Sequence, residues 1–272
     1  SSKLEFWNQR RGIIRSRRGG WKIGRGVFSH GYNMMEELVG QKSYFQVMIL
    51  QATGRLLERK YADRVEAIFI CMSWPDPRIW CNQIGALGGT LRASVVTSTC
   101  LGILAGDSTL YGQKPLLAGV GFITQALKDH KAGWSAEKIV AEECKKHRGK
   151  PLLMGYARPI AKGDERVTAI ERYNKEHQLE AGEHLKLAYQ IDRVMTEQFG
   201  ESININGYSS AIMADHGFSP QQTYQLAATV VASGVTACYL DTLERPAESF
   251  LPLRCDDIDY QGPPLRPVPE KE

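Results

Sequence analysis

The sequence lacks several signals that would place it in a special class. Its six cysteines form no C-x-x-C pair and are scattered, so neither a structural zinc site nor a disulfide framework is indicated. No charged start is followed by an apolar core and a cleavage site, and we find no uncharged apolar run of the ~18 residues that a membrane span needs. We therefore expect reduced thiols, no metal site, and a cytoplasmic protein that does not cross a membrane.

The chain also has little excess of either sign of charge, since the net charge of the 272 residues is only +4. Much of it lies in residues 1–25, a basic arm without the interleaved aromatic residues of a single-strand binder. A solvated terminal segment is therefore favoured over a nucleic-acid contact, and an arm that lies over a partner subunit is a further possibility. The basic residues of the arm are Arg10, Arg11, Arg15, Arg17, Arg18, Lys22 and Arg25.

Strand patterns are nearly absent, whereas apolar residues recur at helical spacing along most of the chain. A hydrophobic share of 43% and a charged share of 24% fit a globular protein, so we predict an all-α fold. Only 203–208 is predicted to be a short extended piece, and the proline-rich end after Pro246 is expected to wrap the surface. The predicted helices are 34–39, 45–52, 62–72, 137–147, 166–175, 182–199 and 219–233.

Two segments are rich in small residues and nearly free of charge, Ile84 to Leu104 and Pro115 to Leu127. Small side chains let neighbouring helices approach closely, so we predict a central helix or helix pair in each region. Surfaces this apolar are rarely left exposed. We therefore predict at least a homodimer.

Four segments carry a resemblance to a known family. His30–Leu38 is similar to an early R-G-Y-x-I-x-x-L segment, and Gly155–Arg166 to a G-F-G-H-x-V/I-x-K-x-x-D-P-R signature. Asn204–Ser210 is similar to N-V-D-F-Y-S-G or N-V-D-G-L, and Gly234–Asp257 to an ending of the form G-H-Y-L-D…R…D-D-I. In this order and spacing they resemble the citrate synthase superfamily, and the length resembles that of its short citryl-CoA lyases.

The resemblance implies a citrate synthase-like fold with a large helical domain and a small helical lobe. Residues 26–150 would form the first part of the large domain and 151–235 the small lobe. Residues 236–272 would return to the large domain and end in the proline-rich tail. The resemblance also implies coenzyme A as cosubstrate, a carboxylate or keto acid as its partner, and active sites near a dimer interface.

In the family an Asp takes a proton from the methyl of acetyl-CoA, one His stabilises the enolate, and another polarises the acceptor carbonyl. Here the Asp position holds Asn206, the His of G-F-G-H is replaced by Arg158, and the other His has no match. An amide is not a general base at neutral pH, and an arginine cannot shuttle a proton. The resemblance therefore does not imply an ordinary citrate synthase.

The matched positions still suggest how an acid could be bound. Arg166 takes the place of the acceptor-binding Arg of D-P-R and could hold a carboxylate in bidentate fashion. Arg158 could bind a carboxylate or stabilise an oxyanion, with a solvent-facing loop residue as the alternative. Asn206 is a catalytic candidate, but Asn-Gly is equally a common turn pair. Arg254, in the matched C-terminal segment, is a further substrate-binding candidate.

Other residues are candidates for the missing catalytic groups. Asp76 could be a relocated general base with Arg78 beside it, or the loop around it could be a rigid linker with buried tryptophans. His30 could supply an imidazole, although a lone histidine is more often structural. Cys238 is better explained as a buried thiol than as a nucleophile.

These considerations give two hypotheses. The first is a CoA-dependent carbon–carbon lyase or acyltransferase acting next to a carbonyl, of retro-Claisen or retro-aldol type. The second is a non-catalytic relative that binds an acyl-CoA or a carboxylate as a partner or regulator. Binding of CoA without turnover would favour the second.

Overall fold

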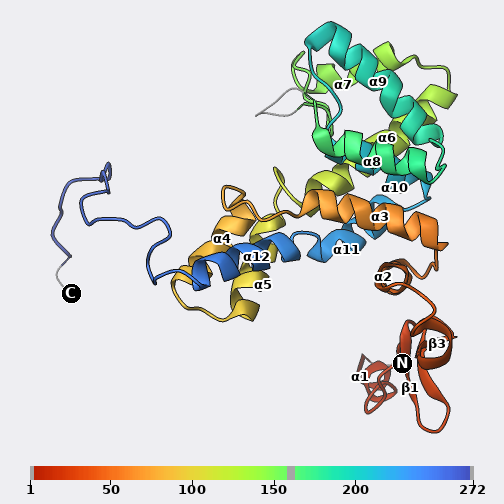
Figure 1. The fold of residues 1–272 in the computed structure, drawn as a ribbon, viewed down its shortest axis with the longest axis horizontal. Helices are drawn as coiled ribbons and strands as arrows, with labels where there is room; N and C mark the ends of the chain where they lie inside the picture. The colour runs from red at the N-terminus through yellow and green to blue at the C-terminus, as the bar shows by residue number, and fades with distance from the viewer. Residues whose placement is uncertain (1–2, 158–162, 270–272) are drawn as a thin grey trace.

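The computed structural model describes residues 3–157 and 163–269 of the chain, and these residues are mainly helical. The all-α prediction is thus confirmed, apart from one small sheet near the N-terminus (Figure 1). The α-helices are α1 Lys3–Asn8, α2 Tyr44–Thr53, α3 Arg59–Met72, α4 Trp80–Thr90, α5 Val95–Gly106, α6 Gln113–Lys131, α7 Ala136–Lys146, α8 Glu165–Glu176, α9 Glu183–Phe199, α10 Ile205–Asp215, α11 Pro220–Leu226 and α12 Ala232–Leu243.

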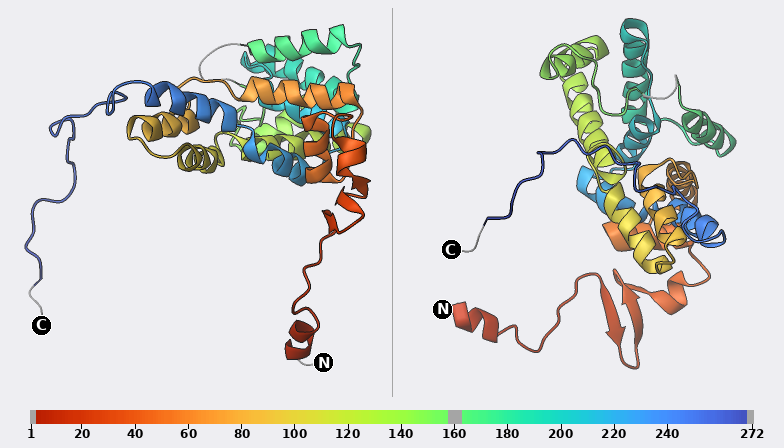
Figure 2. Two further views of the ribbon diagram at one scale, coloured as in Figure 1. Left: turned by 60° about the horizontal axis from the view of Figure 1, so that its bottom comes forward. Right: turned by 90° about the vertical axis from the view of Figure 1, so that its left-hand side faces the viewer.

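The small sheet is a feature that the sequence did not predict. Strands β1 (Gly19–Lys22), β2 (Gly26–Ser29) and β3 (Tyr32–Asn33) pair antiparallel, and a π-helical turn, η1 (Met34–Leu38), follows. The helix expected over 34–39 is therefore only this single turn. Gly26, with a φ of 121°, follows the tight turn from β1 to β2 and adopts a backbone conformation that favours glycine. The sheet and α1 project from the helical body (Figure 2).

Helix α10 lies at the centre of the core. The prediction of an extended piece over 203–208 is wrong for residues 205–208, which belong to this helix. The helix packs on α6 and α9, and Tyr208 and Ile212 are completely buried. Nine of its eleven residues are buried, so the helix has no exposed polar face and shows no amphipathic period. That explains why the sequence pattern did not reveal it.

The small-residue segments form closely packed helices, as predicted. Ile84 to Leu104 spans α4 and α5, which pack on each other and on α12. A Cβ added at Gly85 would lie 2.5 Å from the carbonyl oxygen of Val235, so only glycine permits this approach of α12. Pro115 to Leu127 lies within α6.

The region predicted as one helix over 219–233 is divided. Ser219 caps α11 with a capping box, and Pro220 occupies its first position. A 3-10 turn, η2 (Ala227–Thr229), then separates α11 from α12. Together Pro220–Leu243 is long and apolar enough to cross a membrane by length and composition, which the sequence analysis overlooked. Half of its most apolar window is buried, and its helices pack on α2, α4, α5 and α6, as those of a protein core do.

The C-terminal tail does not wrap the surface as predicted. Its start is held to the end of α4, where the Glu248 amide donates to the carbonyl of Thr90 and the Phe250 amide to the Thr90 hydroxyl. From there to residue 269 the described chain has no helix or strand, and it extends away from the body (Figures 1 and 2).

Candidate functional site

Two of the sequence segments that carry the resemblance meet at one point. Tyr156 and Ile203 form an isolated antiparallel bridge, the Asn204 amide donates to the Gly155 carbonyl, and the Ala157 amide donates to the Ser202 carbonyl. The contact is closest at Gly155 and Gly207, where a Cβ on either residue would collide with the backbone of the other. This crossing fixes the start of α10 against the segment that precedes residue 158.

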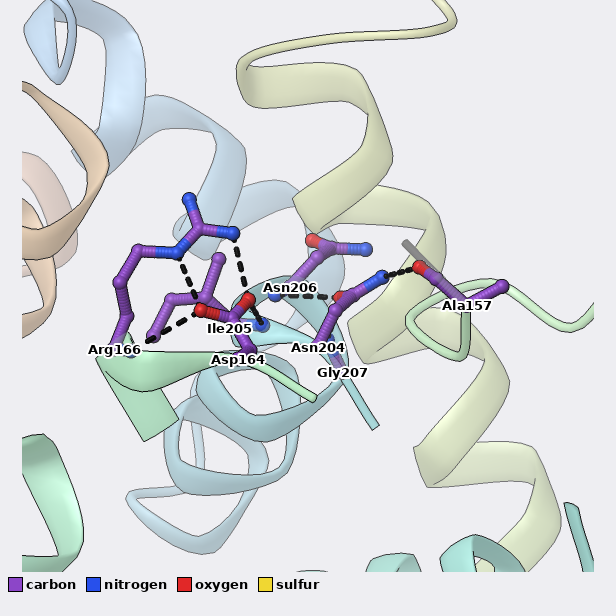
Figure 3. A network of polar contacts seen from close by, with 7 residues as sticks. All are labelled: Ala157, Asp164, Arg166, Asn204, Ile205, Asn206 and Gly207. Atoms are coloured by element: carbon purple, nitrogen blue, oxygen red, sulfur yellow. Dashed lines mark hydrogen bonds and ion pairs between the residues drawn. The ribbon is translucent and has the colours of Figure 1, made fainter. Parts of the chain in front are cut away.

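Asn204 organises the start of α10. Its side-chain oxygen accepts hydrogen bonds from the amides of Asn206 (2.9 Å) and Gly207 (3.2 Å), which makes it the N-cap of the helix. Its side-chain nitrogen donates to the carbonyl of Ala157 at 2.6 Å (Figure 3). One side chain therefore caps the helix and holds the neighbouring loop.

Asp164 joins α8 to α10 and fixes Arg166. Its Oδ1 accepts from Nε of Arg166 (2.7 Å), and its Oδ2 accepts from Nη2 of Arg166 (2.6 Å) and from the Ile205 amide (2.8 Å) (Figure 3). Burial alone would raise the pKa of Asp164, but the hydrogen bonds from Arg166 and Ile205 outweigh it and hold this pKa below its ordinary value. The carboxylate is thus ionised and occupied with positioning the guanidinium.

Arg166 has one nitrogen left for a ligand. Its Nη1 has no partner in the described parts of the chain, and in Figure 3 it points away from Asp164. The guanidinium carbon lies 5.1 Å from the centre of the Trp74 ring, and the side chain is 20% exposed. The guanidinium is thus held in place while both N–H groups of Nη1 and the second N–H of Nη2 have no partner among the described residues.

Arg166 lines a pocket of about 210 Å³ between α3, α6 and the start of α10. Most of its wall is apolar, with Arg166, Asn204, Asn206 and Tyr111 as the polar side chains. Few polar groups in an apolar pocket are typical of small-molecule sites. The lining residues are Met72, Leu110, Tyr111, Gly112, Pro115, Ala157, Arg166, Asn204, Ile205, Asn206 and Val231.

Asn206 is oriented by the backbone of α6. Its Nδ2 donates to the carbonyl of Pro115 at 3.1 Å, and its Oδ1 is buried without a hydrogen-bond partner in the described chain. A carboxylate here would set an oxygen against the Pro115 carbonyl, so the position favours an amide. The competing interpretation of Asn-Gly as a simple turn is wrong, because both residues lie in the first turn of α10.

The described lining of this pocket contains no carboxylate and no imidazole. Its titratable side chains are Arg166 and Tyr111, and burial raises the pKa of Tyr111, so its phenol stays protonated at neutral pH. These residues can bind an anion and accept or donate hydrogen bonds. They supply no ordinary general base.

Among the other candidates, Arg158 falls outside the described residues, and those that the structure describes do not line the pocket. Asp76 and Arg78 form an ion pair of 2.7 Å in the loop between α3 and α4, and neither lines the pocket. Hydrogen bonds from Arg78 lower the pKa of Asp76.

His30 and Arg254 are also distant from the pocket lining. His30 lies in the turn between β2 and β3, with its ring beside Gly54 and its Nε2 buried. Arg254 lies in the exposed C-terminal tail. Of the predicted residues within the described ranges, the structure therefore brings together Arg166 and Asn206 at the pocket.

Asp164, Asn204 and Tyr111 are site residues that the sequence analysis did not single out. Asp164 two residues before Arg166, at the start of a predicted helix, is a capping signal, and Asn204 precedes α10 in the same way. Either could have been found from the sequence had the helix start been placed correctly. Tyr111 lies in an irregular stretch without a local signal.

No family profile and no curated protein matches the chain, but solved structures do. Citryl-CoA lyase from Hydrogenobacter thermophilus aligns with a TM-score of 0.79 over 94% of this chain and 98% of that chain, at 21% sequence identity. The fold is that of citryl-CoA lyase. ATP citrate lyase from Methanothrix soehngenii, in complex with citrate and coenzyme A, aligns with a TM-score of 0.76 at 17% identity.

The citryl-CoA lyase-like fold is shared by longer proteins. The alignment with that ATP citrate lyase covers 97% of this chain but only 44% of the ATP citrate lyase. Citrate synthase from Thermotoga maritima aligns with a TM-score of 0.60, at 18% identity, over 84% of this chain and 60% of that one. The resemblance inferred from the four sequence segments is thus confirmed at the level of the fold.

Proposed function

We propose that this protein is a CoA-dependent enzyme that makes or breaks a carbon–carbon bond next to a carbonyl, with a carboxylic or keto acid as the second substrate. The likeness to citryl-CoA lyase, and to ATP citrate lyase bound to citrate and coenzyme A, supports the substrate class. The geometry at Arg166 supports the binding of the acid. Coenzyme A is expected by likeness.

The observation that carries the proposal is the guanidinium of Arg166. Asp164 uses its Nε and Nη2, so the side chain is oriented before any ligand arrives, and the two N–H groups on Nη1 remain for a carboxylate or an oxyanion. A donor fixed in advance loses little entropy on binding, which strengthens its contribution. Because Asp164 already balances the charge of Arg166, we expect it to bind one carboxylate rather than a highly charged group.

A retro-Claisen cleavage by the thiol of CoA suits a pocket without a carboxylate base. The CoA thiolate attacks the keto carbon, the bond from that carbon to the α-carbon breaks, and its electron pair forms an enolate on the departing acid. A proton from solvent then completes that product, while the acyl group stays on CoA. A free thiol is partly ionised near neutral pH, so this route needs only stabilisation of negative oxygen, as Arg166 can provide.

The proposal excludes the ordinary citrate synthase reaction. That reaction requires removal of a proton from the methyl of acetyl-CoA, and the matched position holds Asn206, whose amide nitrogen is engaged by Pro115. The Oδ1 of Asn206 can accept a hydrogen bond from a substrate hydroxyl but cannot take up its proton. The amide therefore acts as a binding group.

The experiment is a survey of acids with CoA. The protein would be mixed with CoA and a panel of β-keto acids, and with acetyl-CoA and keto acids, while free thiol is followed. Turnover that falls in Arg166→Lys but not in Arg59→Lys would support the proposal. Arg59 is a suitable control because it too pairs with an aspartate, Asp63, at the start of a helix, but on the surface. Turnover unchanged in Arg166→Lys would refute it.

One observation favours a second candidate, a non-catalytic protein that binds acyl-CoA or a carboxylate. The described pocket lining has no carboxylate or imidazole, as expected of a binding site that performs no proton transfer. Calorimetry separates the two candidates. Saturable binding of acetyl-CoA or CoA together with no turnover over the whole panel would select the binding protein.

A homodimer in the cytoplasm is part of the same proposal. Helix α5 is uncharged and exposes Val96, Leu101 and Leu104 by 69%, 50% and 70%. Such a continuous apolar face is costly in water and fits an interface with a second copy. The exposed basic arm fits a segment that reaches the partner.

A further inference from the structure

A second pocket lies at the opposite end of α3 from the one described above. It has a volume of about 500 Å³ and opens between the start of α3, the loop before it and the end of α10. Arg64 and His216 line it, whereas Met72, eight residues further along α3, lines the first pocket. Eight residues of helix span about 12 Å, so the two sites are separate.

Arg64 is a buried cation. Only 4% of the residue is exposed, and its Nε and Nη2 both donate to Nε2 of His216, at 3.3 and 2.9 Å. A guanidinium has no acceptor, so His216 must accept with an unprotonated Nε2. Burial, and then the charge of Arg64, lower the pKa of His216 to about 4. The partner of this buried cation is therefore a neutral ring.

The described residues give Arg64 no carboxylate partner. Within the described ranges no Asp or Glu oxygen forms an ion pair with it. Burial lowers the pKa of Arg64, and Asp215 is near enough for its charge to oppose that shift. The oxygens of Asp215, however, form hydrogen bonds with the His184 ring and with the amides of His184 and Leu185 at the start of α9. Nη1 of Arg64 has no protein partner there, and it is not sealed from the pocket. A buried charge left in this way is unfavourable unless an anion or water meets it.

The surroundings indicate which anion fits. Three exposed charged residues line the pocket, the cation Arg55 and the two carboxylates Glu58 and Glu180. Together they carry a net negative charge, which disfavours a dianion such as phosphate more than a monoanion. A monocarboxylate carries a single charge, and its planar group matches the fork formed by Nη1 and Nη2. Leu56, Leu57 and the ring of Tyr61 offer an apolar wall for a short carbon chain.

We propose that this pocket binds the carboxylate of a small monocarboxylic acid at Arg64, with the acid's carbon chain against the leucines and the tyrosine. The site is separate from the one that holds Arg166. The binding of the acid does not depend on the reaction proposed there. Helix α3 connects the two, since its first turns carry Arg64 and its last residue lines the other pocket.

Histidine NMR tests the proposal on the whole protein. The chain has six histidines, and of these only His216 lines the pocket, so ¹⁵N-labelled histidine reports on the site. Propionate would be titrated against sodium chloride of equal ionic strength. We expect a saturable shift of the His216 ring signals with a dissociation constant in the millimolar range, unchanged in Arg166→Lys.

The variants isolate Arg64. Arg64→Met should weaken propionate binding at least about ten-fold, which is about 1.4 kcal/mol. Arg59→Met, the same change at an exposed position of the same helix, should leave it unchanged. Arg64→Lys keeps the charge without the fork and should weaken binding several-fold, which covers a failure of Arg64→Met to fold. The proposal would be overturned if the Arg64 variants bound propionate as tightly as the wild type does, or if the His216 signals did not shift. It would also be overturned if inorganic phosphate bound more tightly than propionate.

Discussion

Replacing Asn206 with aspartate tests why an amide occupies this position. The substitution Asn206→Asp removes the donor to the Pro115 carbonyl, 3.1 Å away, and faces that carbonyl with a carboxylate oxygen instead. Loss of this hydrogen bond costs about 1 kcal/mol, and the mismatch between two acceptors in a half-buried site adds about 1–2 kcal/mol. The start of α10 offsets about 0.3–1 kcal/mol, because a helix N-terminus favours negative charge. We expect a net loss of about 1–3 kcal/mol at neutral pH.

This loss should depend on pH with a definite sign. Below about pH 3.9 the introduced carboxyl is protonated in both the folded and unfolded states and can donate to Pro115, so little stability is lost. As the pH rises above that value, the unfolded state ionises first, because the folded site raises the pKa. Stability therefore falls until the folded pKa is passed and is constant above it.

Denaturant unfolding at pH 4.0, 5.5 and 7.5 would measure this difference. Gln198→Glu, the same change of amide to carboxyl at an exposed position of α9, serves as the control and should show no comparable trend. A variant Asn206→Asp as stable as the wild type at pH 7.5 would refute the argument that Pro115 selects the amide. So would a loss that is the same at all three values of pH.

Three further predictions follow from the site and the surface. Arg166→Lys should raise the free energy of the transition state by about 2–3 kcal/mol, which lowers kcat/KM on the true substrate about 30- to 150-fold. The helical circular dichroism should not change. Acetyl-CoA with oxaloacetate should release CoA far below the ~10 per second of an ordinary enzyme, and turnover near that rate would show that another residue supplies the base. Light scattering should show a dimer at micromolar concentration, and Leu104→Glu, at a side chain 70% exposed on α5, should shift it toward the monomer. A monomeric wild type would contradict the dimer.

Features set by near neighbours in the chain could be predicted from the sequence. Ser135 caps α7 by accepting from the amide three residues on, and Gly200 ends α9 in the left-handed conformation; serine and glycine are the residue types that favour these positions. Arg166 was found because it belongs to a local motif, whose residues lie within a few positions of one another. Such contacts leave a pattern within a few positions.

Contacts between distant residues could not be predicted in this way. Pro115 is 91 positions from Asn206, and no pattern in either segment shows that they meet. Helix α10 was missed because burial on every side removes the alternation that identifies a helix. Arg64 and His216, 152 positions apart, each resemble an ordinary polar residue until the fold joins them.

Asp76 and Arg78 attracted attention as a pair, and the structure shows that they form an ion pair with each other.

The crossing of Gly155 and Gly207 has a consequence for recognising related sequences. Neither residue can acquire a side chain while the other backbone remains in place, and Gly155 also has a φ of 91°. The two positions are therefore bound to each other by geometry, whatever chemistry the neighbouring positions perform. Some divergent proteins of this fold will have other residues at the acid and base positions. We expect this pair of glycines, at an interval of about fifty residues, to identify such proteins more readily than their catalytic residues do.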